Sequence, residues 1–463
     1  MSPRVRAVVL NFNGGRHVID CVAALRATEW PAGDLEIVVV DNASSDGSDG
    51  EIRRLFPDVE IRPTGANLGF PANNVAMADL DDVDFVALVN NDAFVDPGWL
   101  GPLVDELHGD EGLGAVCPRI LFAPRFLDLT LTSPTFRPGP GDGRDLGVRL
   151  SGVEVDGEDL WRDAQRVEGF WGQEHGAGEE ERFEWTAERA VVRVPVPDGA
   201  AGPTTVTVRL RLAAEARKTV IVEGGSGPVE AAVGPKPAWV EATITGEPYD
   251  VVNNVGSLLI EGGYGADRGY LQRDDGQFDE AAEVFAWCGG GVLLAKRYLE
   301  EVGLFDERFF LYYEDTDIAW RGRSRGWRYR YVPASRFRHI HAASSGEGSA
   351  LFQHYVERNR LLMLVKNAPL GLAAGAVWRY VLITASYARR DVVAPMLRAH
   401  RPNTVLLRRR LRSFLAFLRL LPAMLAARFR SRRKQVVDDA ELVGWAVPQP
   451  GPERSGAAES GEL

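Results

Sequence analysis

Three carboxylates within four residues, Glu314, Asp315 and Asp317, directly follow the almost wholly aromatic run at residues 309–313. Carboxylates this close repel one another, and apolar rings reduce their solvation, so at least one pKa should rise. A carboxylate with a raised pKa at the edge of a pocket is what a general base needs. The same three residues would also suit a helix N-terminus, where negative side chains complement the backbone dipole. Both interpretations hold together, because a helix start is a rigid mount for a base.

Asparagine and aspartate side chains also cluster where three predicted strands end. The strand-like segments 5–10, 35–40 and 85–89 run, in that order, into Asn11 and Asn13, Asp41 and Asn42, and Asn90 and Asp92. Strands that alternate with helical segments predict a mostly parallel sheet, and ligands bind such sheets beyond the carboxyl ends of the strands. Three polar clusters at equivalent strand ends therefore favour a ligand site. A dinucleotide-binding fold would compete, but the first turn lacks the G-x-G-x-x-G pattern.

Glycines offer further places where a ligand could approach the backbone. Gly69 follows Asn67 in the loop between the second and third polar clusters, and it permits close approach to the chain. Residues 289–291 are three consecutive glycines before another predicted strand. A tight entry into that strand would explain these glycines equally well.

Two histidines, His339 and His341, follow a predicted edge strand at residues 327–333. An isolated histidine is more often structural than a ligand, but an imidazole that closes a site already holding Asp92 would suit a divalent metal. The three cysteines are too few and too scattered for a disulfide framework or a zinc cluster. A reducing, cytoplasmic setting is therefore the default expectation.

The hydrophobic pattern changes near residue 132. Residues 204–212 alternate cleanly between apolar and polar side chains, and shorter strand-like runs occupy 190–196, 219–222 and 239–245. Short strands separated by Gly and Pro turns predict an antiparallel sandwich. Because the helix-and-strand pattern resumes near residue 254, this module is expected to be inserted. Pattern alone allows either a carbohydrate-binding or a spacer role.

The net charge of −12 is distributed unevenly. Residues 376–434 carry fifteen Lys and Arg against one acid, a local charge of +14, which leaves −26 on the remainder. Apolar side chains at helical spacing from Leu411 to Phe429, edged by arginines, predict a helix in the headgroup layer of an anionic membrane. A helix packed on the protein body with solvated arginines would show the same pattern. The apolar stripe argues against a nucleic-acid partner, and Arg379 makes 370–388 a poor spanning helix.

Several ordered motifs together resemble a known family. They are Asn11-x-Asn13-Gly14, Val40-Asp41-Asn42-Ala43-Ser44-Ser45-Asp46-Gly47-Ser48, Asn67-Leu68-Gly69-Phe70, Asn90-Asn91-Asp92 and Tyr313-Glu314-Asp315-x-Asp317. The set looks like family 2 glycosyltransferases, and within them bacterial rhamnosyltransferases of cell-envelope polysaccharide synthesis. The likeness covers residues 1–125 and 254–367, including Arg358-Asn359-Arg360 and Lys366-Asn367.

The resemblance implies a GT-A fold, a nucleotide-diphosphate sugar donor and inversion at the anomeric carbon. Asp315 matches the catalytic base, with Glu314 and Asp317 as supporting charge or helix cap. Asp92 matches the last residue of the D-x-D metal motif, and His339 or His341 the histidine that completes a Mn or Mg site. The donor-binding residues implied in the same way are Asn11, Asn13, Asp41, Asn67, Gly69 and Asn90, where Asp41 would contact the base and Asn90 stands first in the metal motif.

The expected fold class is α/β, with a Rossmann-like mostly parallel GT-A sheet, an inserted antiparallel β-sandwich and a C-terminal helical region. Five parts are expected in the chain. They are a nucleotide-sugar-binding half (1–131), the inserted sandwich (132–253), an acceptor and catalytic half (254–367), a basic amphipathic membrane-associating region (368–435) and a disordered acidic tail (436–463). The expected location is cytoplasmic, peripheral at the inner face of the cell membrane, with contact through residues 405–434.

The predicted function is transfer of a sugar, rhamnose by resemblance, to a hydroxyl of a lipid-linked or polysaccharide acceptor. The alternative is a non-catalytic glycan-binding or scaffold protein with a degenerate nucleotide pocket. Asn90 in the metal motif and the inserted module motivate that alternative. Binding of nucleoside diphosphates, with and without Mn or Mg, separates the two hypotheses.

Overall fold

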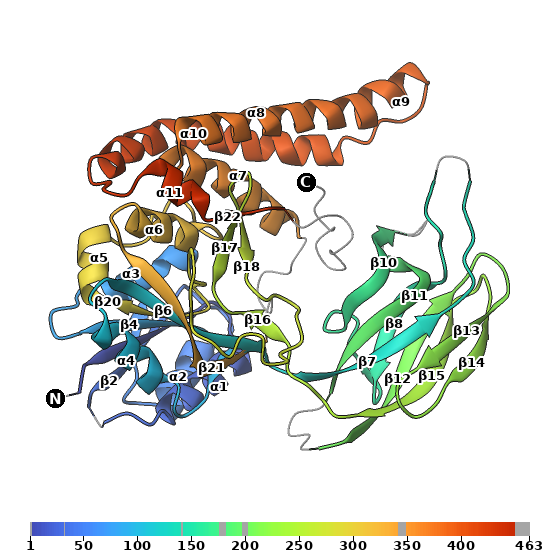
Figure 1. Cartoon of the computed structure of the whole chain (residues 1–463), viewed down its shortest axis with the longest axis horizontal. Coiled ribbons are helices and arrows are strands. Elements are labelled where there is room, and N and C mark those ends of the chain that lie inside the picture. The colour runs from blue at the N-terminus through green and yellow to red at the C-terminus, as the bar shows by residue number, and fades with distance from the viewer. Residues whose placement is uncertain are drawn as a thin grey trace. The chain divides into compact units, whose positions relative to one another are not determined.

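The computed structural model describes residues 2–31, 33–139, 142–175, 182–196, 202–340 and 349–449. The chain divides into two compact units (Figure 1). Unit 1 comprises Met1–Ala123, Val252–Tyr270 and Asp275–Gln449, and unit 2 comprises Pro124–Val251 and Leu271–Asp274. The five-part division expected from the sequence stays a prediction, and His341 lies outside the described residues.

Unit 1 is built on a ten-stranded mixed sheet with the path β19-β21-β6-β20-β4-β1-β2-β3. Six of these strands, β3, β2, β1, β4, β6 and β21, run in one direction, because β20 is antiparallel to both of its neighbours while the other pairs among them are parallel. The strands are β1 (Val5–Asn11), β2 (Leu35–Asp41), β3 (Glu60–Pro63), β4 (Phe85–Asn90), β5 (Ala93–Val95), β6 (Leu113–Phe122), β16 (Val252–Asn254), β19 (Ala282–Glu283), β20 (Gly291–Ala295) and β21 (Arg328–His339).

Continuous apolar runs form the centre of this sheet because strands covered on both faces bury every side chain. All ten residues of β6 and all five of β20 are buried. The predicted strand at 327–333 exists within β21, but it is not an edge strand, since β21 pairs with both β6 and β19. The helices of the sheet domain are α1 (Gly15–Arg26), α2 (Ser48–Leu55), η1 (Phe70–Asn73), α3 (Asn74–Met77), α4 (Leu100–Gly109), α5 (Lys296–Val302) and α6 (Glu314–Arg323).

Unit 2 is a nine-stranded antiparallel sheet with the path β14-β13-β7-β11-β8-β12-β15. Its alternating residues, such as Val206, Val208 and Leu210, enclose a separate hydrophobic core. A bridge between Gly225 and Ile244 joins the two ends of the path, so the sheet curls on itself. The strands are β7 (Arg125–Thr132), β8 (Arg149–Val155), β9 (Glu158–Asp159), β10 (Gln165–His175), β11 (Arg182–Val196), β12 (Thr204–Ala213), β13 (Lys218–Glu223), β14 (Val229–Val233) and β15 (Ala238–Gly246).

The chain leaves and re-enters unit 1 at adjacent positions. In the antiparallel pair of β6 and β16, Leu121 lies opposite Val252. Next along the chain, Phe126 and Tyr249 exchange two backbone hydrogen bonds of 3.0 and 3.1 Å. The intervening residues are therefore an insertion in the sheet domain, and the predicted fold class is confirmed.

The C-terminal part of unit 1 is helical. Figure 1 shows α8 and α10 as a long pair, and both pack with α7. The elements are α7 (Ala350–Asn367), α8 (Leu370–Tyr387), η2 (Ala388–Val393), α9 (Ala394–Leu397), α10 (Val405–Arg432) and α11 (Asp439–Gly444), with a small sheet of β17 (Ser257–Ile260), β18 (Tyr264–Asp267) and β22 (Ala446–Val447). Among the described helices, none is both long and apolar enough to cross a bilayer.

The prediction of a disordered tail from residue 436 is wrong for the part that the structure describes. Asp438 caps α11 by accepting a hydrogen bond from the Ala440 amide, and Leu442 is buried in the unit 1 core. β22 then pairs with β17. Low apolar content failed to predict this order because a few residues docked on a preformed core are enough to fix a short segment. Residues 450–463 lie outside the described part.

Candidate active site

The first two polar clusters meet because β1 and β2 are in register, with Asn11 opposite Asp41. The Asn11 amide nitrogen donates to Asp41 Oδ1 at 3.2 Å and to Ser48 Oγ at 2.9 Å. A Cβ placed on Gly14 would lie 2.7 Å from both Asn11 Oδ1 and Asn91 Nδ2, so the β4 end packs against the same turn. The structure therefore brings all three predicted strand-end clusters to one edge of the sheet.

Asn13 lies at the rim of this edge. It is exposed and adopts a left-handed conformation with φ of 52°, which Asn tolerates better than most residues. Its side-chain oxygen accepts a hydrogen bond of 2.7 Å from the Ser45 amide. Asn13 therefore ties the turn after β1 to the turn after β2.

Asn42 organises the next loop; it belongs to the second predicted strand-end cluster, but it was not among the residues expected to bind the donor. Its amide nitrogen donates to Asn67 Oδ1 at 3.0 Å and to the Gly69 carbonyl at 3.2 Å, while its oxygen accepts from the Leu68 amide at 2.8 Å. Asn67 in turn accepts a hydrogen bond of 2.9 Å from the Gly69 amide. The position of Asn42 beside Asp41 was the signal that could have identified it.

Gly69 joins this edge to the loop that carries the candidate base. Its φ is 70°, and a Cβ at this position would lie 1.9 Å from the Phe310 carbonyl oxygen. The following amide, of Phe70, donates to that same oxygen at 2.7 Å. Only glycine permits the approach, because any side chain would overlap Phe310.

Asp92 and His339 come together through strand pairing, because β21 pairs with β5 and sets His339 opposite Ala93. His339 Nε2 lies 2.9 Å from Asp92 Oδ1 and 3.2 Å from the Asn90 amide nitrogen. On the other side of the ring, Nδ1 lies 3.2 Å from Asn253 Oδ1. Asn253 was missed, since only the pairing of β16 with β6 brings it here.

This donor set fits a hard divalent cation of the kind the sequence predicts. An amide oxygen can only accept, so Asn253 favours a proton on Nδ1, and Nε2 would then offer its lone pair to a cation bound beside Asp92. Such orientation of the distal nitrogen is typical of a metal-binding imidazole. In the described part of the chain no cluster of three or more His, Cys, Asp or Glu forms a complete metal site. Magnesium and manganese sites commonly take their remaining ligands from substrate phosphates and water.

Asp315 lies one residue into α6 and is half-buried. Its Oδ2 accepts from the Gly289 amide at 3.4 Å, and its Oδ1 accepts from Thr316 Oγ1 at 3.1 Å. Loss of solvation raises the pKa of Asp315, although these hydrogen bonds oppose the rise. The backbone carbonyl of the next residue, Gly290, accepts from the Asn90 backbone amide at 3.1 Å. Gly289 and Gly290 therefore link Asp315 to Asn90, whose side chain contacts His339.

Glu314 is buried, with 5% of its surface exposed, and its Oε2 has no hydrogen-bond partner. Burial, followed by repulsion from Asp315, raises the pKa of Glu314 well above its ordinary value. The neutral carboxylic acid is therefore favoured at this position. This differs from a supporting charge, one of the two roles expected for Glu314, because no cation among the described residues forms an ion pair with it. Its place in the first turn of α6 leaves the other expected role, a helix cap, as a prediction.

Asp317 is fully buried and fully paired. Its Oδ2 accepts from Lys366 Nζ at 2.8 Å and from Arg321 Nε at 3.0 Å, and its Oδ1 accepts from Asn367 at 2.8 Å. Lys366 also contacts Asp306 at 2.7 Å. Asp317 therefore anchors α6 to α7 and does not face the polar edge of the sheet.

Asn359 of α7 holds the loop that leads into α6. It is fully buried, and its amide nitrogen lies 2.8, 2.7 and 2.8 Å from the carbonyl oxygens of Phe309, Leu311 and Tyr312. Phe310, Tyr312 and Tyr313 all have φ between 66° and 69°, a region that bulky side chains avoid. Such strain persists only where the surroundings hold it, and it clusters at functional sites.

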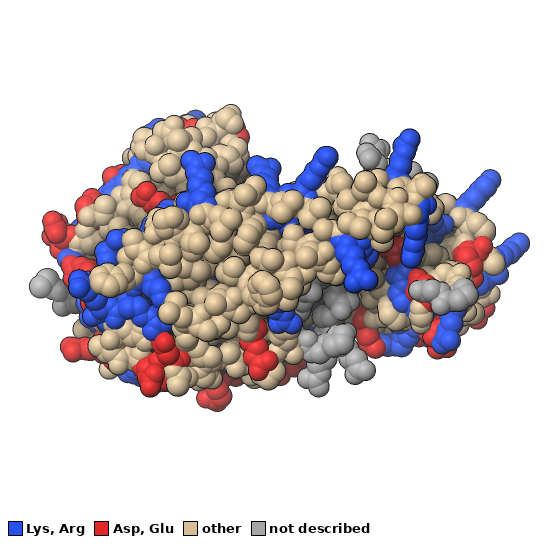
Figure 2. All heavy atoms as spheres, turned by 90° about the horizontal axis from the view of Figure 1, so that it is seen from above, with Lys and Arg blue, Asp and Glu red and all other residues tan. Residues whose placement is uncertain are grey.

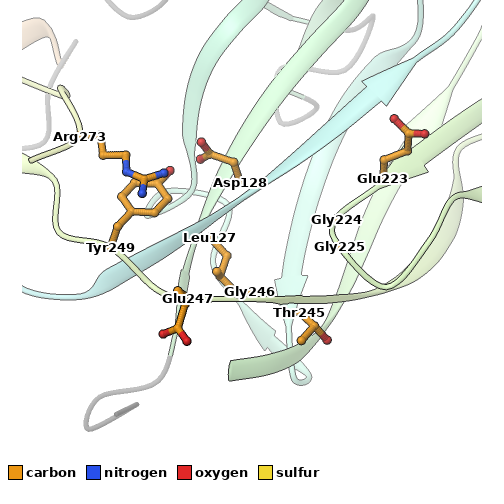
Figure 3. A pocket seen from close by; sticks show the side chains of 10 residues that line it. All are labelled: Leu127, Asp128, Glu223, Gly224, Gly225, Thr245, Gly246, Glu247, Tyr249 and Arg273. Atoms are coloured by element: carbon orange, nitrogen blue, oxygen red, sulfur yellow. The ribbon is translucent and has the colours of Figure 1, made fainter. Parts of the chain in front are cut away.

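Unit 2 contains a separate cavity of about 340 Å³ (Figure 3). Three of its lining side chains are acidic, namely Asp128, Glu223 and Glu247. The Arg273 guanidinium lies over the Tyr249 ring, 4.2 Å from its centroid. No residue predicted for the site lies here.

Comparisons with known proteins agree with the geometry of unit 1. Residues 7–145 match the family model described as Glycosyl transferase family 2. Two proteins named N-acetylglucosaminyl-diphospho-decaprenol L-rhamnosyltransferase, from Mycobacterium tuberculosis strains CDC 1551 / Oshkosh and ATCC 25618 / H37Rv, are each 22% identical to this chain over 363 residues. The match covers 76% of this chain and 80% of each relative. The predicted resemblance is confirmed.

Two solved structures are similar to this chain at a lower level. GalNAc-T7 with UDP, GalNAc and Mn²⁺ has a TM-score of 0.43 and 13% identity, covering 93% of this chain and 57% of its own. The mannosyltransferase PcManGT from Pyrobaculum calidifontis, in complex with GDP-Man and Mn²⁺, has a TM-score of 0.36 and 14% identity, covering 96% and 79%.

Proposed function

We propose that this chain, which carries a family 2 glycosyltransferase domain and resembles rhamnosyltransferases, transfers rhamnose with inversion from a nucleotide-diphosphate sugar. The acceptor would be a hydroxyl of a lipid-linked or polysaccharide glycan of the cell envelope. One observation carries the proposal: a half-buried carboxylate with a raised pKa, Asp315, is linked to the Asp92–His339 pair by a chain of hydrogen bonds through Gly289, Gly290 and Asn90.

The donor would lie along the edge formed by the ends of β1, β2 and β4. Asn11, Asn13, Asp41, Asn67, Gly69 and Asn90 are the residues to which we assign donor binding. Asp41 is held by Asn11, which favours a fixed hydrogen-bond acceptor for the nucleotide base. The close approach of Gly69 to Phe310 would put the donor beside the loop that precedes Asp315.

Asp92 and His339 would hold a Mn or Mg ion. When bound, such an ion supplies positive charge that stabilises the leaving diphosphate. Asn253 would keep the His339 lone pair directed into the site. Asn90 would contribute through its amide group, which carries no charge.

Asp315 would act as the general base. As the acceptor oxygen attacks the anomeric carbon, its proton passes to the Asp315 carboxylate while the bond from that carbon to the diphosphate breaks. The electron pair of the broken bond leaves with the diphosphate, and attack from the opposite face inverts the centre. The raised pKa of Asp315 makes the carboxylate a better proton acceptor.

The α8–α10 pair would hold the enzyme peripherally at the inner face of the cell membrane. Leu415 and Phe429 of α10 are each 65% exposed and Trp378 of α8 is 63% exposed, although Phe417 and Met424 pack inward. Figure 2 shows Lys and Arg projecting around this face, with few acidic side chains. Apolar side chains within a basic surface suit the headgroup layer of an anionic membrane.

Replacement of Asp315 by Asn tests the proposal. Transfer, measured as release of nucleoside diphosphate from a screen of donor sugars, should fall about a hundredfold or more, because an amide cannot accept the proton. Calorimetry should show unchanged donor binding. Asp105→Asn, an exposed carboxylate on α4, serves as the control. Near-normal turnover of Asp315→Asn would remove Asp315 from this role.

A glycan-binding scaffold is the second candidate, favoured by the polar cavity of unit 2. Such a protein would bind glycan through that module and would not bind nucleoside diphosphates. Calorimetry with nucleoside diphosphates, with and without Mn or Mg, distinguishes the two. Metal-dependent binding that Asp92→Asn and His339→Ala abolish supports the enzyme, and absence of binding supports the scaffold.

A further inference from the structure

Unit 1 contains a cavity of about 550 Å³, which is lined by the 304–308 segment, by residues of α6 and by the C-terminal end of α10. Six cationic side chains line it: Arg308, Arg321, Arg325, Lys366, Arg430 and Lys434. Only two acidic side chains, Asp306 and Glu307, line the same space. The cavity is therefore strongly basic, in a protein whose net charge is −12.

Two acidic groups, Asp306 and Asp317, form ion pairs with three of the cavity's cations. Asp306 pairs with Arg308 at 2.6 Å and with Lys366 at 2.7 Å. Arg321 pairs with the buried Asp317 at 3.0 Å. The positive charge that remains comes from the other three side chains.

Arg325, Arg430 and Lys434 form no ion pair within the described part of the chain. The Nε of Arg325 is buried without a hydrogen-bond partner. Arg430 lies in the last turn of α10, and Lys434 lies in the turn that follows the helix, where its amide donates to the Ser431 carbonyl at 3.0 Å. An unsatisfied guanidinium donor and two unpaired cations around one cavity favour an anion with several acceptor oxygens.

We propose that this cavity binds a phosphate group. Phosphate offers enough acceptor oxygens for the Arg325 donor and for Arg430 and Lys434 together. Two apolar side chains near the same end of α10, Leu425 and Phe429, are 48% and 65% exposed. A membrane phospholipid could therefore place its phosphate in the cavity and its chains along these two side chains, whereas a free phosphate compound would use the cavity alone.

Two residues that line the cavity also form the ion pairs that hold α6 in place. Lys366 and Arg321 line it and also hold Asp317, two residues after the candidate base. A phosphate bound here would touch the ion network that anchors α6 to α7. Binding should therefore raise the thermal stability of the full chain, since a ligand that binds only the folded state stabilises it.

Two paired charge-neutralising variants provide the test. Arg430→Gln/Lys434→Gln removes two cavity cations, and Arg412→Gln/Arg419→Gln removes two exposed arginines of α10 outside the cavity. Both double variants lower the net charge by the same amount. Each is compared with the wild-type full chain in calorimetric titration with inorganic phosphate and in flotation with phosphatidylglycerol–phosphatidylcholine vesicles.

Phosphate should bind at one saturable site in the wild type and the control, and at least tenfold more weakly in the cavity variant. If vesicle binding also falls further in the cavity variant than in the control, a lipid supplies the phosphate. If vesicle binding falls equally in both while phosphate binding is lost only in the cavity variant, a free phosphate compound is the ligand. Equal behaviour of the two variants in both assays would overturn the proposal. Neither assay measures turnover, so the result is independent of sugar transfer.

Discussion

The side-chain nitrogen of Asn359 lies 2.8 Å from the carbonyl oxygen of Tyr312, a residue whose φ of 67° is strained for a bulky side chain. The same nitrogen also contacts the carbonyls of Phe309 and Leu311. Arg358, the preceding residue, donates to the Phe309 carbonyl at 2.8 Å. Helix α7 therefore determines the path of the loop that leads into α6.

Asn359→Ala should reduce kcat about tenfold or more while leaving the affinity for nucleoside diphosphate unchanged. The three carbonyls would lose a buried donor, at about 1–3 kcal/mol for each unsatisfied group, and the loop before Asp315 would relax. Steady-state kinetics and calorimetry measure the two effects separately. A parallel loss of kcat and donor affinity would show that Asn359 supports the whole fold rather than the base.

Gly69→Ala should destabilise unit 1 and weaken transfer, because the added Cβ would meet the Phe310 carbonyl at 1.9 Å. Gly65→Ala is the matched control, since Gly65 has a similar φ of 74° with nothing within 4 Å of a Cβ. The control shows the cost of a positive φ, about 1–2 kcal/mol, whereas Gly69 combines its φ with a ψ of −161° and should cost more. Denaturant unfolding should show a larger loss for Gly69→Ala, and equal losses would contradict the contact.

Glu314→Gln should change how stability depends on pH. Burial and Asp315 raise the pKa of Glu314 in the folded state, so above about 4.5, its ordinary pKa, the folded chain binds more protons than the unfolded chain. Wild-type stability should therefore fall as pH rises through this window, and the glutamine variant should lack this component. Unfolding free energies between pH 4 and 8 provide the measurement. Parallel pH profiles for the two proteins would show that Glu314 is charged when folded.

Lys366→Met should cost about 3–5 kcal/mol of unfolding free energy, because it leaves the buried Asp306 and Asp317 without their shared cation. Arg16→Met, which breaks the exposed Arg16–Asp20 pair, should cost far less, because water screens the exposed charges. The same denaturant titration serves both variants. Equal costs would mean that the α6–α7 contact does not depend on the buried ion network.

The pH profile of Lys366→Met should also differ at low pH. Burial alone would raise the pKa of Asp306, but hydrogen bonds from Arg308 and Lys366 hold it far below its ordinary value. This contribution to stability is present above the unfolded pKa and is lost as pH falls. The wild type should therefore lose more stability than the variant between about pH 5 and pH 2.

Much of unit 1 follows from local pattern. Strands such as β1, β2 and β4 are short apolar runs bounded by polar turns, and periodicity finds them directly. The helix start at Glu314 followed from acidic residues in a first turn. These predictions needed no long-range information.

Other features depend on contacts that spacing cannot reveal. Asn253 reaches His339 only because β16 pairs with β6. The burial of Asp317 follows from Lys366, almost fifty residues away. The order of residues 436–449 depends on docking of Leu442 and β22 on unit 1. In each case tertiary packing determines where the residue lies and whether it is buried, and the local sequence does not encode that packing.

The antiparallel pair of β6 and β16 holds the two ends of the insertion together within the sheet of unit 1. Leu121 and Val252 already lie opposite each other, so a short hairpin turn could replace everything between them. A longer or shorter insertion would change the closure entropy only slightly, since that term grows with the logarithm of length. Proteins that share this sheet could therefore gain, lose or replace an insertion at this position while the hydrophobic core of unit 1 stays unchanged.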